Sequence, residues 1–136
     1  MDWAAVGTTS LVFSAFAVHH LSHDEKRALL GKVFEHLEPG GTFVLFDAFR
    51  PEDPLADEIV EKLACREIQR RVQQARGTAP ALESIIERDR ESKGAEGDRE
   101  ASFEAQLRWL RDTGFVGVAP IFLDVRMGGM VATKPS

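Results

Sequence analysis

Apolar residues form two short continuous runs in the first third of the chain, with a helical pattern between them. Residues 10–18 read Ser-Leu-Val-Phe-Ser-Ala-Phe-Ala-Val, and residues 42–48 read Thr-Phe-Val-Leu-Phe-Asp-Ala. Runs of this length are typical of strands that are buried on both faces, as in a parallel sheet. Between the runs, apolar residues recur at helical spacing, at Leu29, Leu30, Val33, Phe34 and Leu37. The pattern predicts a strand–helix–strand unit with a crossover long enough for parallel strands.

The ends of the first helix are marked by polar and breaking residues. Ser22 can cap its first turn, and Glu25, three residues later, completes a capping box. Pro39-Gly40-Gly41 follows the last apolar position and predicts the stop. The helix therefore precedes the second strand directly.

The middle of the chain is rich in charge and predicts a helical insert over about residues 52–100. One helix is predicted over 54–76 and a shorter one after Pro80, while 92–100 has the composition of an exposed loop. The apolar side of the first of these helices comprises Leu55, Ile59, Leu63, Ile68 and Val72. Two interpretations stay open: a solvated helical surface, or a helical lid over a ligand site.

The last third of the chain predicts a helix followed by two strands. Ser102 can cap a helix that carries Phe103, Leu107 and Leu110 and ends at Gly114. Residues 115–123 and 125–133 then predict an antiparallel hairpin. The order of elements predicts an α/β fold with a parallel pair of strands, a C-terminal hairpin and flanking helices.

Composition narrows the class of protein. A chain of 136 residues and 15.1 kDa predicts a single domain, residues 1–136. Hydrophobic residues at 43% and charged residues at 29% exclude a disordered or collagenous chain. The net charge of −5 argues against a dedicated nucleic-acid binder. No apolar run approaches the roughly 20 residues of a membrane helix, and no basic region marks a signal peptide. The single cysteine, Cys65, suits a reducing compartment, so the expected location is the cytoplasm.

Polar side chains with useful chemistry follow the two predicted strands. His19 and His20 come directly after the first, and an imidazole can act as a base or bind a substrate group near neutral pH. Asp47 interrupts the second near its end, with Phe49 and Arg50 beside it. Packing or capping roles are the alternative for each. The histidines lack a cysteine partner or a second set of clustered ligands, so no metal site is predicted.

Four stretches, taken together, resemble the C-terminal half of the class I S-adenosylmethionine-dependent methyltransferases. Residues 10–21 are similar to the fourth strand of that family and the loop after it, and residues 37–47 to a helix end and the fifth strand. Residues 106–115 resemble the last helix, and residues 128–135, Gly-Gly-Met-Val-Ala-Thr-Lys-Pro, the closing strand. The end of the chain is also similar to the carboxy-S-adenosylmethionine synthases, without indicating a substrate.

The resemblance implies a partial Rossmann-like sheet made of the last four of seven strands, with S-adenosyl-L-methionine as cofactor. It implies that the loop with His19 and His20 lines the cofactor and substrate pocket. Together with their chemistry at the strand ends, this makes His19 and His20 the candidate catalytic residues, and Asp47, Phe49 and Arg50 the candidates for contact with a small-molecule acceptor, where Arg50 could pair with an anionic group. Ser14, Ala15 and Phe16 are then expected to line the cofactor, together with Asp2 and Trp3, which resemble the segment that holds the adenine.

One departure from the family concerns glycine: no Gly-x-Gly occurs among the 11 glycines. The glycine-rich loop that cradles the cofactor belongs to the N-terminal half of the family fold, which is expected to be absent here, so activity of this chain alone is in doubt. The first hypothesis is methyl transfer to a small-molecule acceptor. The alternative is a non-catalytic, truncated module that pairs with itself or with a partner chain through an open sheet edge.

Overall fold

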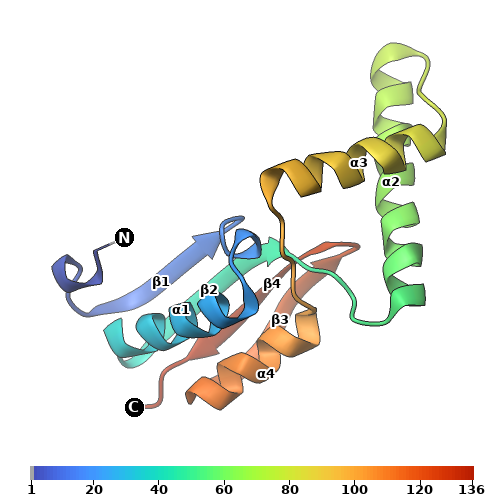
Figure 1. Cartoon of the computed structure of the whole chain (residues 1–136). Coiled ribbons are helices and arrows are strands. Elements are labelled where there is room, and N and C mark those ends of the chain that lie inside the picture. The colour runs from blue at the N-terminus through green and yellow to red at the C-terminus, as the bar shows by residue number, and fades with distance from the viewer. Residues whose placement is uncertain (1) are drawn as a thin grey trace.

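The computed structural model describes residues 2–136, and its elements follow the predicted order (Figure 1). A four-stranded sheet and four α-helices make up most of the chain. The elements are the short 3₁₀ helix η1 (Trp3–Ala5), β1 (Thr9–Ala15), the 3₁₀ helix η2 (Val18–His20), α1 (His23–His36), β2 (Leu37–Ala48), α2 (Pro54–Arg76), α3 (Leu82–Glu96), α4 (Phe103–Thr113), β3 (Val116–Asp124) and β4 (Met127–Thr133).

The sheet has the strand order β1-β2-β4-β3. Strands β1 and β2 are parallel, with Phe13 opposite Val44, because α1 carries the chain back between them. Strand β4 runs antiparallel to β2 and pairs with β3 as a hairpin. The predicted parallel pair and C-terminal hairpin are therefore present, and β4 joins them into one sheet.

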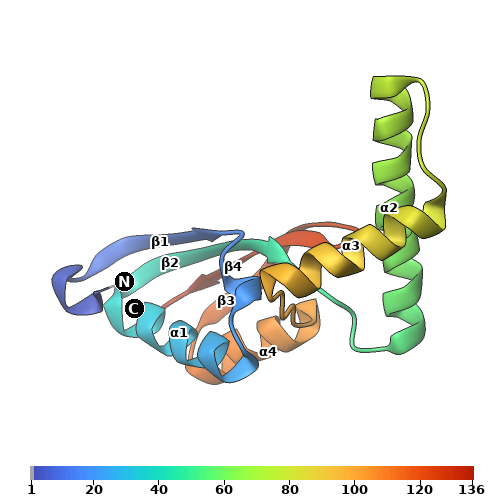
Figure 2. The same ribbon diagram turned by 45° about the horizontal axis from the view of Figure 1, so that its top comes forward.

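Helices α1 and α4 cover the same face of this sheet (Figure 2). Their apolar stripes pack on alternate residues of β2, such as Phe43 and Leu45, which are at most 1% exposed. The capping box predicted at Ser22 and Glu25 is present at the start of α1. The buried core comprises Val18, Leu30, Val33, Leu37, Phe43, Leu45, Phe49, Ala101, Ala105, Trp109, Leu110, Phe115, Met130 and Ala132.

The opposite face of the sheet carries a row of aromatic rings. Phe46 lies between Phe13 and Phe122, at centroid distances of 5.3 and 5.4 Å. Gly129 lies under the Phe46 ring, where a Cβ would collide with it. Phe13 is 58% exposed and Leu11 is 56% exposed. The prediction that residues 10–18 form a strand buried on both faces is therefore wrong, because one face of β1 is exposed. The open sheet edge expected in the alternative hypothesis is present: within residues 2–136, β1 is an edge strand.

Three predicted boundaries differ from the structure. The first strand ends at Ala15 rather than residue 18, because Phe16 takes a left-handed backbone conformation (φ 53°) that turns the chain. Strand β2 begins at Leu37, before the predicted start at residue 42. Helix α3 ends at Glu96, and Gly97, which follows it, has a left-handed backbone conformation. Only residues 97–100 of the predicted loop therefore lie outside the helix.

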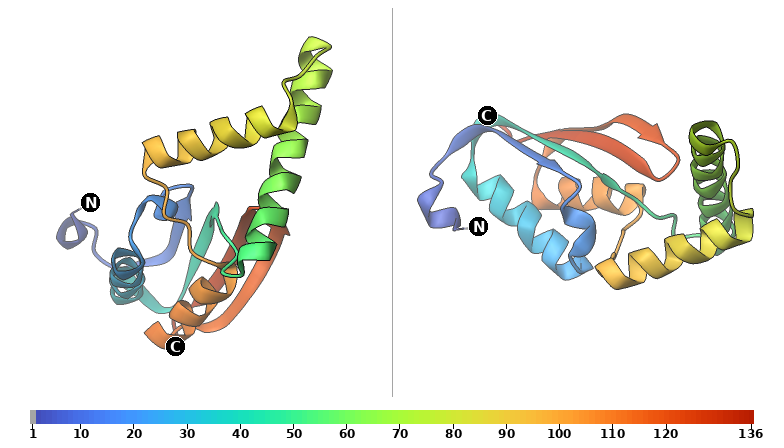
Figure 3. Two further views of the ribbon diagram at one scale, coloured as in Figure 1. Left: turned by 45° about the vertical axis from the view of Figure 1, so that its right-hand side comes forward. Right: turned by 90° about the horizontal axis from the view of Figure 1, so that it is seen from above.

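Helices α2 and α3 form an arm that projects from the sheet, and α3 runs back toward the ends of β1 and β2 (Figures 1 and 3). Cys65 and Ile85 are its buried residues. Much of the apolar side of α2 faces away from other side chains, with Leu55 at 66%, Ile59 at 50% and Leu63 at 49% exposure. In residues 2–136, no helix combines the length and apolar character that crossing a membrane requires.

Candidate functional site

The carboxyl ends of the parallel strands β1 and β2 meet at one edge of the sheet, where ligands bind in open α/β sheets. The turn at Phe16 leads into η2, which presents His19 beside the end of β2. The Nδ1 atom of His19 lies 2.5 Å from Oδ1 of Asp47. Asp47 is fully buried and also accepts a hydrogen bond from the amide of Ala48 at 2.8 Å. Two residues singled out from separate parts of the sequence, one after β1 and one near the end of β2, are thus joined, with Asp47 holding the imidazole.

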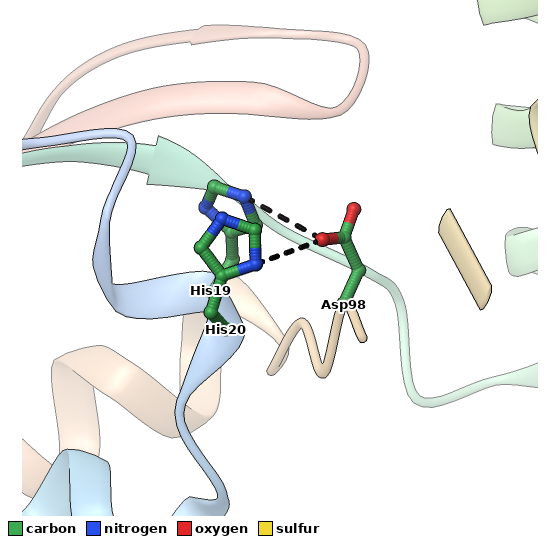
Figure 4. A group of neighbouring side chains, drawn as sticks. All are labelled: His19, His20 and Asp98. Carbon is green, nitrogen blue, oxygen red and sulfur yellow. Dashed lines mark ion pairs between the residues drawn. The ribbon is translucent and has the colours of Figure 1, made fainter. Parts of the chain in front are cut away.

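Asp98, in the loop between α3 and α4, completes the group (Figure 4). Its Oδ1 atom lies 3.7 Å from Nε2 of His19 and 3.1 Å from Nδ1 of His20. The two imidazole rings stack at a centroid distance of 4.0 Å. Sequence reasoning missed Asp98, because it stands in a polar segment whose composition indicates only a loop.

Lys26 ties the segments of this site together. Its buried ammonium donates to the carbonyl of Leu21 at 2.7 Å and to the carbonyl of Arg99. The amide of Arg99 donates in turn to the carbonyl of His19 at 2.7 Å. Burial lowers the pKa of Lys26. Sequence reasoning missed this residue too, although its place four residues before Leu30, on the apolar side of α1, was a signal.

A cleft of 590 Å³ adjoins this group at the base of the arm, with Asp98 in its wall. Phe49 and Arg50, both predicted to contact an acceptor, also line it. Phe49 is 4% exposed and packs edge-on against Phe103 at 4.6 Å. Arg50 donates two hydrogen bonds to Asp57, at 2.7 and 2.9 Å, which raise the pKa of Arg50. The predicted residues are near the cleft, but the Arg50 guanidinium already has an anionic partner.

Other charges around the cleft are paired as well. Arg90 lies 2.5 Å from Glu61, and Lys93 lies 2.5 Å from Glu100. Burial, the largest single influence, would raise the pKa of Glu100, but the hydrogen bond from Lys93, a backbone hydrogen bond and the nearby positive charges together lower that pKa. These cations of the cleft therefore already have carboxylate partners within the protein.

The residues predicted to bind cofactor lie in two places. Ser14, Ala15 and Phe16 lie at the same edge of the sheet as His19. Asp2 and Trp3 lie at the other end of β1 (Figure 1). There Asp2 accepts a hydrogen bond from the amide of Ala4, and the Trp3 ring packs on His36 at 5.0 Å. The structure therefore does not bring the five residues together.

Comparison with known proteins comes from sequence and from structure. No protein-family model matches the sequence. The carboxy-S-adenosyl-L-methionine synthase of Aeromonas salmonicida is 28% identical over 138 positions, which cover 97% of this chain and 50% of that protein. The corresponding enzyme of Cronobacter sakazakii is 34% identical over 55 residues, or 40% of this chain and 22% of that protein. The chain spans about half the length of the Aeromonas relatives it matches.

Solved structures give the same fold. The apo form of the S-adenosylmethionine-dependent methyltransferase SibL superimposes with a TM-score of 0.60 at 19% identity, covering 96% of this chain and 32% of that one. An O-methyltransferase family protein of Burkholderia thailandensis gives a TM-score of 0.62 at 13% identity, covering 99% and 33%. These matches confirm the predicted fold class and the resemblance to class I methyltransferases.

Proposed function

We propose that this chain, which has the fold of part of a class I S-adenosylmethionine-dependent methyltransferase, forms the acceptor side of a methyl-transfer site for a small molecule. The observation that carries the proposal is the His19–Asp47 pair at the carboxyl ends of two parallel strands, at 2.5 Å. A base held by a carboxylate, at the edge where such sheets bind ligands, is an arrangement suited to removing a proton from an acceptor.

The tautomer of His19 follows from its partner. A carboxylate can only accept a hydrogen bond, so we assign Nδ1 of His19 as the donor to Asp47, and Nε2 then keeps its lone pair. Asp47 is fully buried and His19 is 12% exposed, so the ring is held in one orientation. Nε2 is then placed to take a proton from an acceptor hydroxyl or amine as the methyl group arrives.

S-adenosylmethionine, when bound, supplies the electrophilic methyl group. This chain's contribution to holding it is one wall, formed by Ser14, Ala15 and Phe16 at the end of β1. Two features leave room for the cofactor beside this wall. No strand among residues 2–136 pairs with the outer edge of β1, and the ring of Phe16 is exposed. The paired charges of the adjoining cleft favour an acceptor without a strong negative charge.

A histidine-resolved binding experiment tests the proposal on the chain itself. Titration of the metal-free protein with S-adenosylhomocysteine, followed by NMR of the imidazole signals, should shift His19 and His20 and leave His36 unchanged. His36 is the internal control because it lies at the far end of α1, against Trp3. Absence of any shift at His19 and His20 at millimolar ligand would contradict a cofactor site on this chain.

Activity gives a second readout. The assay follows transfer of a radiolabelled methyl group from S-adenosylmethionine to an acceptor by a protein that contains this chain. His19→Asn should lower the rate of methyl transfer by about 10²–10⁴-fold. His36→Asn is the matched control and should leave the rate unchanged. Equal rates for the wild type and His19→Asn would remove His19 as the base.

The open edge of β1 favours a second candidate function, a module that pairs with a second copy of itself. Leu11 and Phe13 are more than half exposed on β1, and an unpaired apolar edge recruits another strand. Light scattering should then show a dimer that Phe13→Lys converts to a monomer. A wild-type chain that is monomeric at high concentration contradicts pairing with itself, and a dimer formed only with another protein would redirect the proposal to a partner chain.

A further inference from the structure

We propose that His19, His20 and Asp98 form a binding site for a divalent transition metal of the zinc type, with Asp47 orienting the first ligand. The proposal goes beyond methyl transfer and does not depend on it. It rests on three donor atoms from two separate segments, Nε2 of His19, Nδ1 of His20 and Oδ1 of Asp98, which all lie within 4.8 Å of one another (Figure 4).

The first argument concerns lone pairs that face one another. Because Nδ1 of His19 donates to Asp47, its Nε2 presents a lone pair toward Oδ1 of Asp98, 3.7 Å away. Oδ1 of Asp98 is buried and accepts no hydrogen bond from residues 2–136, although Nδ1 of His20 lies 3.1 Å away. The Asp98 side chain is 9% exposed and points at the two rings. A buried carboxylate oxygen without a hydrogen-bond donor is costly, and a cation held between it and the two imidazoles would remove that cost.

The second argument is the spacing of the donor atoms. Zinc binds imidazole nitrogen and carboxylate oxygen at about 2.0–2.2 Å, so ligand atoms at the corners of a tetrahedron lie about 3.3–3.5 Å apart. The distances from Asp98 to His20 and to His19, 3.1 and 3.7 Å, lie on either side of that value. Small rotations of the side chains, of which His20 is 45% exposed, suffice to equalise them.

The third argument is the support around the donors. A metal-binding histidine usually donates its other nitrogen to a carboxylate, as His19 does to Asp47. Lys26 fixes both segments by donating to the carbonyls of Leu21 and Arg99, on either side of the group. Two imidazoles and one carboxylate select zinc, cobalt or nickel over magnesium or calcium. Three protein ligands leave a fourth position open, and the cleft that Asp98 lines adjoins it.

The metal and the proposed base use the same atom. While a metal occupies Nε2 of His19, that atom has no lone pair to accept a proton. The two uses of His19 therefore exclude one another, and zinc should inhibit methyl transfer that relies on this base.

Metal titration of the full, chelator-treated chain tests the site. Co²⁺ should give the visible absorption bands of a four- or five-coordinate site, and Zn²⁺ should bind with a stoichiometry of one by calorimetry. Asp98→Asn and His20→Asn should lose this binding, and Asp47→Asn should weaken it by about 10–100-fold. Asp112→Asn and His36→Asn, which change an exposed aspartate and a distant histidine, should bind as the wild type does.

The outcomes are distinct. Absence of one-to-one binding, or equal binding by His20→Asn and the wild type, overturns the proposal. Far-UV circular dichroism checks each fold, and His20→Asn decides the matter if Asp98→Asn unfolds, because His20 is exposed enough to be replaced. The titration contains no S-adenosyl compound, so a failed metal site leaves the cofactor experiment on the metal-free chain unaffected, and the reverse holds too.

Discussion

Helices α4 and α2 carry apolar stripes of the same helical spacing, but the stripes meet different surroundings. On α4, Trp109 is 5% exposed and Leu110 is fully buried against the sheet. On α2, Leu55 and Ile59 are half exposed or more, on an arm that projects from the sheet. Periodicity therefore fixes which face of a helix is apolar, while the position of the helix in the fold decides whether that face is covered.

The two regions are also held by different interactions. The sheet and its two helices are held by a continuous apolar core. The arm buries little apart from Cys65 and Ile85, and ion pairs tie it to the rest of the chain. Arg126 in the turn between β3 and β4 makes two hydrogen bonds to Asp89 of α3, at 2.7 and 3.1 Å. The arm is thus the region whose order depends on a few polar contacts.

The largest expected difference between the regions comes from removing one leucine from each. Leu110→Ala should lower the free energy of unfolding by about 2–5 kcal/mol, because it opens a cavity in the core. Leu55→Ala, at a position 66% exposed, should change it by less than about 0.5 kcal/mol. Urea unfolding followed by circular dichroism measures both. An equal loss for Leu55→Ala would show that the apolar side of α2 is covered in solution.

The ion pair at the base of the arm should give the next effect. Arg126→Gln should cost about 1.5–3 kcal/mol, because Asp89 loses charge-assisted hydrogen bonds at a site where both side chains are less than 20% exposed. The loss should be local, so Cys65, buried in the arm, should react faster with a thiol reagent. The control is Arg88→Gln, which changes an exposed residue of α3 next to Asp89. An unchanged rate at Cys65 would show that this pair does not hold the arm.

Helix caps offer a smaller contrast. Ser22 caps α1 with a full capping box, whereas Ala81 precedes α3 without a side-chain cap. Ser22→Ala should destabilise the protein by about 1 kcal/mol, and Ala81→Ser should stabilise the arm by a similar or smaller amount. Ala81 already has an extended backbone (φ −59°, ψ 149°) that suits a capping serine. The rate at which a thiol reagent modifies Cys65 measures this effect, and the rate should be lower in Ala81→Ser than in the wild type. A higher rate would contradict stabilisation of the arm by the added cap.

The smallest effect is a surface titration on α2. Hydrogen bonds from Arg70, and then from Arg71, lower the pKa of Glu67 to about 2. A lowered carboxyl pKa stabilises the folded state above its ordinary value of 4.5, and that contribution disappears as the pH falls from 4.5 toward about 2. NMR of the Glu67 carboxyl should show the low value, and Arg70→Gln with Arg71→Gln should restore the ordinary one. A normal pKa in the wild type would mean that these exposed pairs do not persist in solution.

Much of the fold could be predicted because its signals are local. The capping box at Ser22, the end of α4 at Gly114 and the bounds of α2 at Pro54 and Arg76 were all indicated by neighbouring residues. The open edge of β1 was expected, because the strands that precede it in the family fold were expected to be absent. The exposed face of β1, with Leu11 and Phe13, was not indicated, because an apolar run has the same composition on an exposed face as on a buried one. Nor was the length of α3, whose polar end resembles a loop in composition.

The sequence by itself determined that His19 and Asp47 stand at strand ends, since local apolar runs end beside them. Only the tertiary structure decided that they touch, that Asp98 faces both histidines and that Lys26 fixes the two segments. It also placed Asp2 and Trp3 away from that edge. The physical reason is range: helix and strand propensity act between neighbours in the chain. Contacts between a loop before α4 and the ends of β1 and β2 exist only after the sheet and helices have packed.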